Sequence, residues 1–152
     1  DRSVSRGLGD VYKRQVHGLV YLGHNNSIFT SEALAENICT NPVRVRRVLA
    51  KCRKKGLVQT KKGVHGGYFL TDNLEAITLK NVYEAIKIPI IQNTWHSGYI
   101  NEQCMISSGM SEAMDDLYDE LNKDAVAKLA TITLKDMEVK LYAIQNERGT
   151  KI

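Results

Sequence analysis

The residues with the clearest chemical potential are cations gathered in one short stretch of the chain. Residues 41–66 carry nine lysines and arginines and no aspartate or glutamate, whereas residues 67–152 have a net charge of −5 and residues 1–40 are neutral. A run of like charge is often only a solvated face, but a run flanked by neutral and acidic segments also suits a polyanion. We therefore ask which elements would present these cations together.

Two short helices joined by a turn are predicted around the basic stretch. Thr30 is a favourable N-cap for a helix over residues 31–38, and Asn41 followed by Pro42 begins a second helix that runs to about residue 55 before a glycine ends it. Two helices joined by a turn of three or four residues are typical of a helix-turn-helix. The second helix then corresponds to a recognition helix.

The second helix divides into an apolar face and a basic face. At 100° per residue, Val45, Val48, Leu49 and Cys52 share one side, which we expect to face the core. A helix fits the major groove of DNA and reads base edges with its N-terminal residues. Arg44, Arg46 and Arg47 near the start of the helix are therefore candidates for base contacts, guanine above all, and Lys51 and Lys54 for phosphate contacts. The predicted DNA contacts on this helix are Asn41, Val43, Arg44, Arg46, Arg47, Lys51 and Lys54.

Two further elements are expected on the same side. Residues 57–61 and 68–70 read as two strands joined by a glycine-containing turn, which form a wing that carries Lys61, Lys62 and His65. Thr30 and Ser31 begin the preceding helix, whose free backbone N–H groups favour a phosphate. Double-stranded DNA is preferred to RNA, because no platform of exposed aromatic residues is evident for base stacking.

The C-terminal half is predicted to consist of helices. Thr78 caps a helix that continues to about residue 86, residues 89–110 fit no period, and a last helix begins after Thr133. Between them, apolar residues recur every three or four positions from residue 111 onward. This narrow stripe requires a partner helix, either within the chain or in a second copy. The predicted dimerisation residues are Met114, Leu117, Leu121, Ala125, Leu129 and Ile132.

These observations predict a mainly α fold with a small β wing, a winged helix-turn-helix followed by a long C-terminal dimerisation helix. Residues 1–15 fit neither period and are expected to be a non-native or disordered leader, so that the first helix retains only its second half. The predicted divisions are 1–15 for the leader, 16–88 for the DNA-binding domain, 89–110 for a linker and candidate sensor loop, and 111–146 for the dimerisation helices.

Several segments resemble the Rrf-two family of bacterial winged-helix transcription regulators, the group that contains IscR, NsrR and CymR. The similarity covers roughly residues 16–141, and residues 131–136 resemble the family's ending after its long helix. The resemblance implies a homodimer joined through that helix, with one recognition helix of each subunit in successive major grooves of a pseudo-palindromic operator. The matching segments are residues 30–36 (TSEALAE), 41–49 (NPVRVRRVL), 53–58 (RKKGLV) and 63–70 (GVHGGYFL).

The chain departs from the cluster-binding members of this family. Those members carry three cysteines close together before the dimerisation helix, whereas residues 89–110 offer only Cys104. Thiolates hold iron–sulfur clusters, so we expect no cluster and no other cofactor. Cys104 is a candidate redox thiol, while Cys39 and Cys52 are expected to be small core residues.

Other classes of function find less support. The four histidines lack metal-ligand spacing, and neither a phosphate-binding glycine motif nor a nucleophile elbow occurs, so no enzyme is predicted. No run of about 18 apolar residues and no apolar segment after a basic N-terminus are present, so we expect a cytoplasmic bacterial protein outside the membrane. The prediction is a sequence-specific DNA-binding regulator, expected to be a repressor. The alternatives are a winged-helix scaffold for protein partners and a regulator controlled by a protein that docks on residues 89–110.

Overall fold

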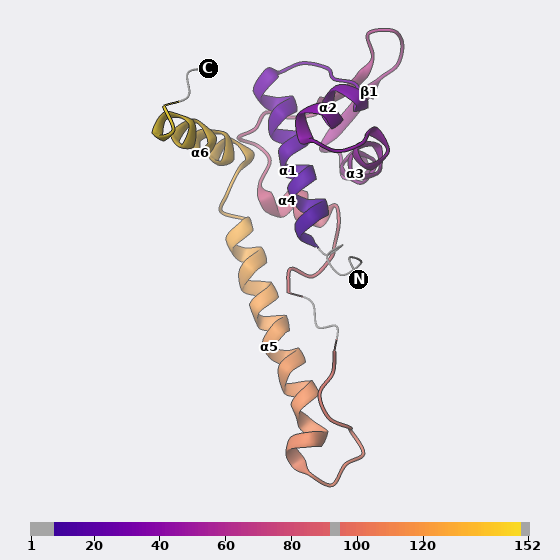
Figure 1. The fold of residues 1–152 in the computed structure, drawn as a ribbon, viewed down its shortest axis with the longest axis vertical. Coiled ribbons are helices and arrows are strands. Elements are labelled where there is room, and N and C mark those ends of the chain that lie inside the picture. Colours follow the sequence, from indigo (N-terminus) through magenta and orange to yellow (C-terminus); the bar gives the residue numbers. More distant parts are fainter. Residues whose placement is uncertain (1–7, 92–94, 150–152) are drawn as a thin grey trace.

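The computed structural model describes residues 8–91 and 95–149, and its architecture is the predicted one, mainly helical with a small wing (Figure 1). The two strands form one antiparallel sheet. Within the described ranges, no helix is long and apolar enough to cross a membrane. In chain order the elements are α1 (Leu8–Asn25), α2 (Ser31–Ile38), α3 (Pro42–Lys54), β1 (Val58–Lys61), β2 (Gly67–Leu70), α4 (Leu79–Glu84), α5 (Met105–Leu129) and α6 (Leu134–Glu147).

The hydrophobic core joins α1, α2, α3 and α4 to the base of the wing. Leu19 and Leu22 of α1, Leu34 of α2 and Val82 of α4 are all buried in one cluster. The face of α3 predicted to be apolar takes part in this packing, so its opposite face is fixed toward solvent. The four predicted core residues of α3 are buried, namely Val45, Val48, Leu49 and Cys52.

Polar N-caps determine where four of the helices begin. The side chains of Thr30, Asn41, Thr78 and Thr133 each accept a hydrogen bond from the backbone N–H three residues later, at 2.9–3.2 Å. Such caps satisfy N–H groups that have no partner inside the helix. The predicted starts of α2, α3, α4 and α6 are therefore confirmed. One predicted end differs, because α4 stops at Glu84 and not near residue 86.

The wing is tied to the segment that leads into α2. β1 pairs with β2 so that Val58 lies opposite Leu70 and Lys61 opposite Gly67. Phe29 and Tyr68 form an isolated antiparallel bridge, with N–O distances of 3.0 and 2.8 Å. Gly67 has φ of +150°, and a Cβ there would lie 2.4 Å from the Phe29 carbonyl oxygen. Glycine is therefore needed for the close approach that fixes the wing beside the helix-turn-helix.

The expectation that residues 1–15 form a leader outside the fold is wrong for residues 8–15. These residues are the first half of α1, and residues 1–7 lie outside the described part of the chain. Gln15 is fully buried, and the Tyr12 hydroxyl donates a 2.7 Å hydrogen bond to the carbonyl of Leu79. Burial raises the pKa of that hydroxyl. The contacts that hold this half of α1 come from a segment distant in sequence, which its own weak periodicity could not reveal.

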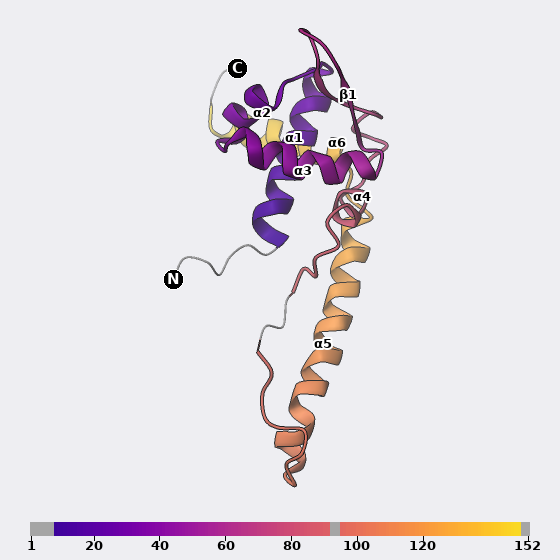
Figure 2. The same cartoon turned by 90° about the vertical axis from the view of Figure 1, so that its right-hand side faces the viewer.

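The boundary predicted between linker and long helix also requires correction. α5 begins at Met105, so the last six residues of the predicted linker 89–110 are helical. Figures 1 and 2 show α5 as a long arm that runs away from the winged helix domain, with the preceding segment beside it. Asn122 fixes this arrangement, because its side chain accepts from the backbone N–H of Ile91 at 2.7 Å and donates to its carbonyl at 2.9 Å. The linker is thus partly held against α5.

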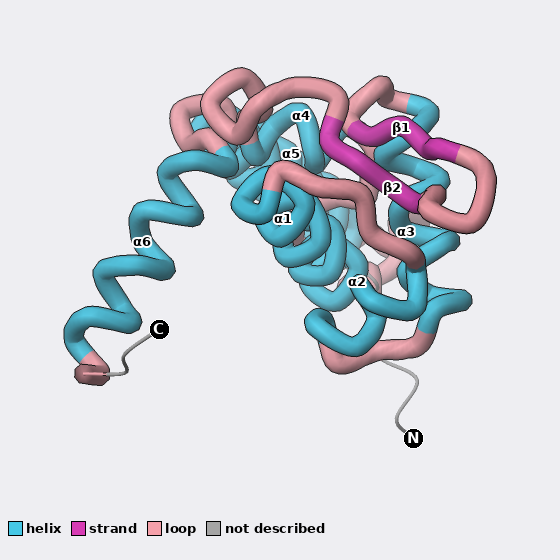
Figure 3. Tube along the Cα trace, turned by 90° about the horizontal axis from the view of Figure 1, so that it is seen from above, coloured by secondary structure: helices cyan, strands magenta, loops and turns pink. Residues whose placement is uncertain are grey.

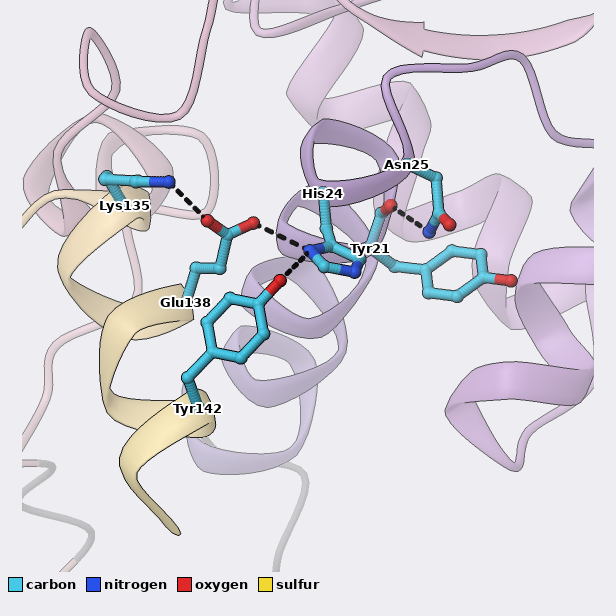
Figure 4. Close-up of polar contacts among 6 residues, drawn as sticks. All are labelled: Tyr21, His24, Asn25, Lys135, Glu138 and Tyr142. Atoms are coloured by element: carbon cyan, nitrogen blue, oxygen red, sulfur yellow. Dashed lines mark hydrogen bonds and ion pairs between the residues drawn. The ribbon is translucent and has the colours of Figure 1, made fainter. Parts of the chain in front are cut away.

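α6 packs on the opposite side of α1 from α2, α3 and the wing (Figure 3). A small polar cluster joins the two helices, as Figure 4 shows. The buried carboxylate of Glu138 lies 2.9 Å from Nδ1 of His24 and 2.6 Å from Nζ of Lys135, and the Tyr142 hydroxyl lies 3.5 Å from the same imidazole nitrogen. The hydrogen bonds from Lys135 and His24 hold the pKa of Glu138 below its ordinary value.

Candidate nucleic-acid interface

The outward face of α3 presents four of the predicted contacts as exposed cations. Arg44, Arg47, Lys51 and Lys54 are all exposed, and no ion pair among residues 8–91 and 95–149 neutralises them. Figure 2 shows α3 on the outside of the body, where it crosses in front of α1. Val43 is also exposed, in the first turn of α3. The structure therefore brings together the residues that the helical period assigned to one surface.

Arg46 is an exception to this arrangement. In the described chain its guanidinium donates to the Ser31 hydroxyl at 2.8 Å and to Glu32 at 3.1 Å, so it is directed toward α2. Both bonds use the Nη1 nitrogen and the side chain stays half exposed, so a base contact by Arg46 stays a prediction that would compete with these bonds. Ser31 is itself buried, and its hydroxyl donates to Glu32 at 3.1 Å. Neither partner was evident in the sequence, since the contact depends on how α2 and α3 pack.

A carboxylate of the protein itself, that of Glu32, already lies at the N-terminus of α2. The Glu32 carboxylate accepts hydrogen bonds from its own backbone N–H and from the Ser31 hydroxyl, and these bonds together with Arg46 lower the pKa of Glu32. The Thr30 hydroxyl is occupied as the N-cap of the helix. A phosphate at this helix end, as predicted, would therefore compete with the Glu32 carboxylate.

The other polar contacts predicted from sequence remain available in part. Asn41 uses its side-chain oxygen as the cap of α3, accepting from the Arg44 N–H at 2.9 Å. On the wing, Lys61, Lys62 and His65 are all exposed, as expected for groups that meet phosphates. The turn between the strands also exposes Val64 to 95%, a residue the sequence analysis did not select. The wing thus carries cations and one apolar side chain at its tip.

The predicted dimerisation stripe divides into two parts in the structure. Leu129 and Ile132 are partly buried against the core of their own chain, and their contact with a partner helix stays a prediction. Met114 and Ala125 are half-buried, while Leu117 and Leu121 are 44% and 39% exposed. No described residue of α5 is buried, although the helix spans 25 residues. The exposed part of the stripe therefore has no adequate partner within the described chain.

Two residues extend the stripe beyond its predicted start. Ile106 and Met110 are exposed on the first turns of α5 and continue the spacing of four residues toward Met114. The spacing was present in the sequence, but the assignment of residues 89–110 to a linker concealed it. We define the dimer seam, the surface predicted to join two copies of the chain, as Ile106, Met110, Met114, Leu117, Leu121 and Ala125.

Comparison with known proteins decides the family. The sequence profile of Rrf2, described as an iron-dependent transcriptional regulator, matches residues 11–139. The chain belongs to the Rrf2 family. Proteins of this family regulate transcription, so the chain is a transcriptional regulator and not an enzyme. The resemblance inferred from the helix and wing motifs is confirmed.

Individual relatives agree with this assignment. YwnA of Bacillus subtilis strain 168, named provisionally as an HTH-type transcriptional regulator, is 27% identical over 113 residues, which are 74% of this chain and 84% of YwnA. A crystal structure of a provisionally assigned transcriptional regulator from Lactobacillus plantarum has a TM-score of 0.74 and 26% identity, with 93% of this chain and 98% of that chain covered. IscR of T. potens shares the fold, with a TM-score of 0.66, 17% identity and coverage of 90% and 88%.

The cysteines of this Rrf2 protein do not fit the iron chemistry in the family's description. Cys52 is buried in α3, where desolvation raises the pKa of its thiol to about 11. Cys39 is exposed in a left-handed conformation at the end of α2, so the expectation of a core residue is wrong there. Cys104 is exposed at the start of α5, where backbone N–H groups lower the pKa of its thiol. Three separate thiols cannot ligate one cluster within a chain.

Metal binding by other side chains finds no support in the described ranges. Residues 8–91 and 95–149 contain no group of three or more histidine, cysteine, aspartate or glutamate side chains placed to hold a metal ion. That this Rrf2 protein works without a cofactor stays a prediction, as does the redox role of Cys104.

Proposed function

We propose that this Rrf2 regulator is a cytoplasmic, homodimeric repressor that binds a pseudo-palindromic site in double-stranded DNA. The observation that carries the proposal is the outward face of α3, where Arg44, Arg47, Lys51 and Lys54 stand exposed beside a basic wing. The opposite face of α3 is buried, so these side chains have one direction in which to reach a ligand. A helix of this width enters the major groove, and the wing then meets the adjacent backbone.

Arg47 and Lys54 are assigned different roles on this surface. Arg47 lies in the N-terminal half of α3, where a recognition helix approaches base edges, and its planar fork matches guanine. Lys54 is the last residue of α3, closer to the backbone, where an ammonium group contacts phosphate without reading sequence. Their positions along α3 therefore assign base recognition to Arg47 and phosphate contact to Lys54.

The experiment that tests this division begins with selection of bound sequences from a random duplex pool. Arg47→Ala should cost about 1–3 kcal/mol on the selected site and relax the preference at one position. Lys54→Ala should weaken all duplexes alike and reduce the salt slope of binding by about 0.9. Lys140→Ala, an exposed lysine of α6 on the far side of α1, is the matched control and should change neither quantity. Equal losses on every sequence for both α3 variants would refute the division.

Homodimerisation is supported by the dimer seam of α5. A helix of 25 residues is about 37 Å long, and an isolated arm of this length with an exposed apolar stripe is unfavourable in water. A second copy supplies a matching stripe, and a two-fold dimer places its two α3 helices on successive half-sites.

Sedimentation tests the seam directly. Leu121→Asp places a charge in the middle of the seam and should halve the particle mass, because an unpaired buried charge is costly. Lys123→Asp changes an exposed residue outside the seam and should leave the dimer intact. An unchanged mass for Leu121→Asp would mean that the stripe packs in another way.

Control by a docking protein is the second candidate, and one observation favours it. Trp95, Tyr99 and Ile100 are all exposed in the segment before α5, which is unusual for large apolar side chains close together. A Trp95→Ser, Ile100→Ser variant separates the candidates. If it dimerises and binds DNA normally when purified but regulates abnormally in cells, docking on this segment is supported; normal regulation would dismiss it.

A further inference from the structure

The first turn of α3 contains an exposed apolar side chain that the fold does not explain. Val43 is 57% exposed and takes no part in the core cluster, whereas Val45 and Val48 of the same helix are buried. A β-branched residue has a lower helix propensity than alanine or the long polar residues that suit a solvated position. If this position contacted only water, alanine or a long polar residue would therefore give a more stable helix than Val43.

The neighbours of Val43 place it on the proposed DNA-facing surface, at the N-terminal end of α3. Arg47 lies one turn later on the same face of α3, since residues i and i+4 are neighbours on a helix. Arg46 is held by Ser31 and Glu32, and the Asn41 oxygen is occupied as the helix cap. Among the described residues at the N-terminal end of α3, Val43, Arg44 and Arg47 therefore remain to meet base edges.

The chemistry of valine selects one kind of base edge in the major groove. Thymine presents a 5-methyl group there, whereas cytosine carries only a hydrogen at the same carbon, and guanine and adenine present hydrogen-bonding groups. A valine side chain can neither donate nor accept a hydrogen bond, so it would leave a polar edge without water and without a partner. Contact with a methyl group removes apolar surface from water on both sides.

We propose that Val43 reads the 5-methyl group of a thymine in each half-site, within one or two base pairs of the guanine contacted by Arg47. Side chains at positions i and i+4 are about 5–6 Å apart at Cβ, which corresponds to one or two base-pair steps of about 3.4 Å. This inference rests on the proposed function, because it requires α3 to lie in the major groove.

Deoxyuridine provides a probe that removes only the methyl group. A duplex selected by the wild-type protein from a random pool is remade with each thymine replaced in turn by deoxyuridine, which leaves all base-pairing groups unchanged. Loss of one buried methyl contact should raise Kd about fourfold in one half-site, and about sixteenfold when both half-sites are changed. Thymines elsewhere in the same duplex are internal controls.

The Val43→Ala variant assigns the effect to this side chain. Val43 is exposed and alanine favours helix, so the variant should fold normally. It should bind the thymine and deoxyuridine duplexes with equal Kd, whereas Arg47→Ala should keep the sensitivity to the methyl group.

The outcomes separate this inference from the proposed function. If the wild-type protein binds no duplex, the proposed function itself fails. If it binds a selected duplex but tolerates deoxyuridine at every position, or if the penalty is unchanged in Val43→Ala, then only the role of Val43 is overturned.

Discussion

Replacement of Gln15 by methionine should stabilise the protein, because the fold buries an amide that it does not satisfy. Gln15 lies on the core side of α1 with no exposed surface. Its Nε2 donates to the Cys52 sulfur at 3.5 Å, a weak acceptor, and its Oε1 has no hydrogen-bond partner among the described residues. Methionine has nearly the same length and no amide, so the change removes the unpaired group without opening a cavity.

The expected gain follows from the cost of the unpaired oxygen. A buried polar group without a partner costs about 1–3 kcal/mol. The substitution removes this cost, but it also removes the weak hydrogen bond to Cys52, which offsets part of the gain. We therefore expect the free energy of unfolding to rise by about 1–2 kcal/mol, which corresponds to about 2–8 °C in Tm for a chain of this size.

Thermal and urea unfolding, followed by circular dichroism at one fixed protein concentration, would measure this gain. A fixed concentration is needed because dimerisation makes Tm depend on it. Gln59→Met, on the exposed face of β1, is the matched control and should stay within about 0.5 kcal/mol of the wild type. A lower or unchanged Tm for Gln15→Met would refute the reasoning, because it would mean that the amide contributes favourably to the core.

Two further predictions concern the carboxylates that the structure places against cations. Glu32→Gln should steepen the dependence of log Kd on log salt concentration by up to about 0.9, because Arg46 and the start of α2 become available to one more phosphate; an identical slope in a mobility-shift titration would contradict this. Glu138→Gln should lower the free energy of unfolding at pH 7. Because the native pKa of Glu138 is lowered, its contribution is full above the ordinary value near 4.5 and is lost as the pH falls through the native pKa, so the two proteins should converge in acid. A difference in urea midpoint that is the same at pH 7 and pH 3 would count against this role.

Local sequence signals determined the helix-turn-helix and its exposed face. The side chains of Thr30, Asn41 and Thr78 each accept a hydrogen bond from a backbone N–H only three residues away. Each cap can therefore be recognised without knowledge of the fold. The period of α3 separates its buried face, with Val45 and Val48, from its exposed basic face in the same way. Much of the candidate site could therefore be predicted, because one helix carries it.

The tertiary structure alone decided which of those residues are free to act. Arg46 lies in the same basic segment as Arg44 and Arg47, yet the packing of α2 against α3 directs it toward Glu32. Tyr12 gains its place in the fold from the carbonyl of Leu79, 67 residues away, and the Asn122 side chain of α5 holds the backbone of Ile91, 31 residues away. Periodicity and capping report contacts within one turn, whereas these contacts arise only when distant segments meet, and no local pattern encodes them.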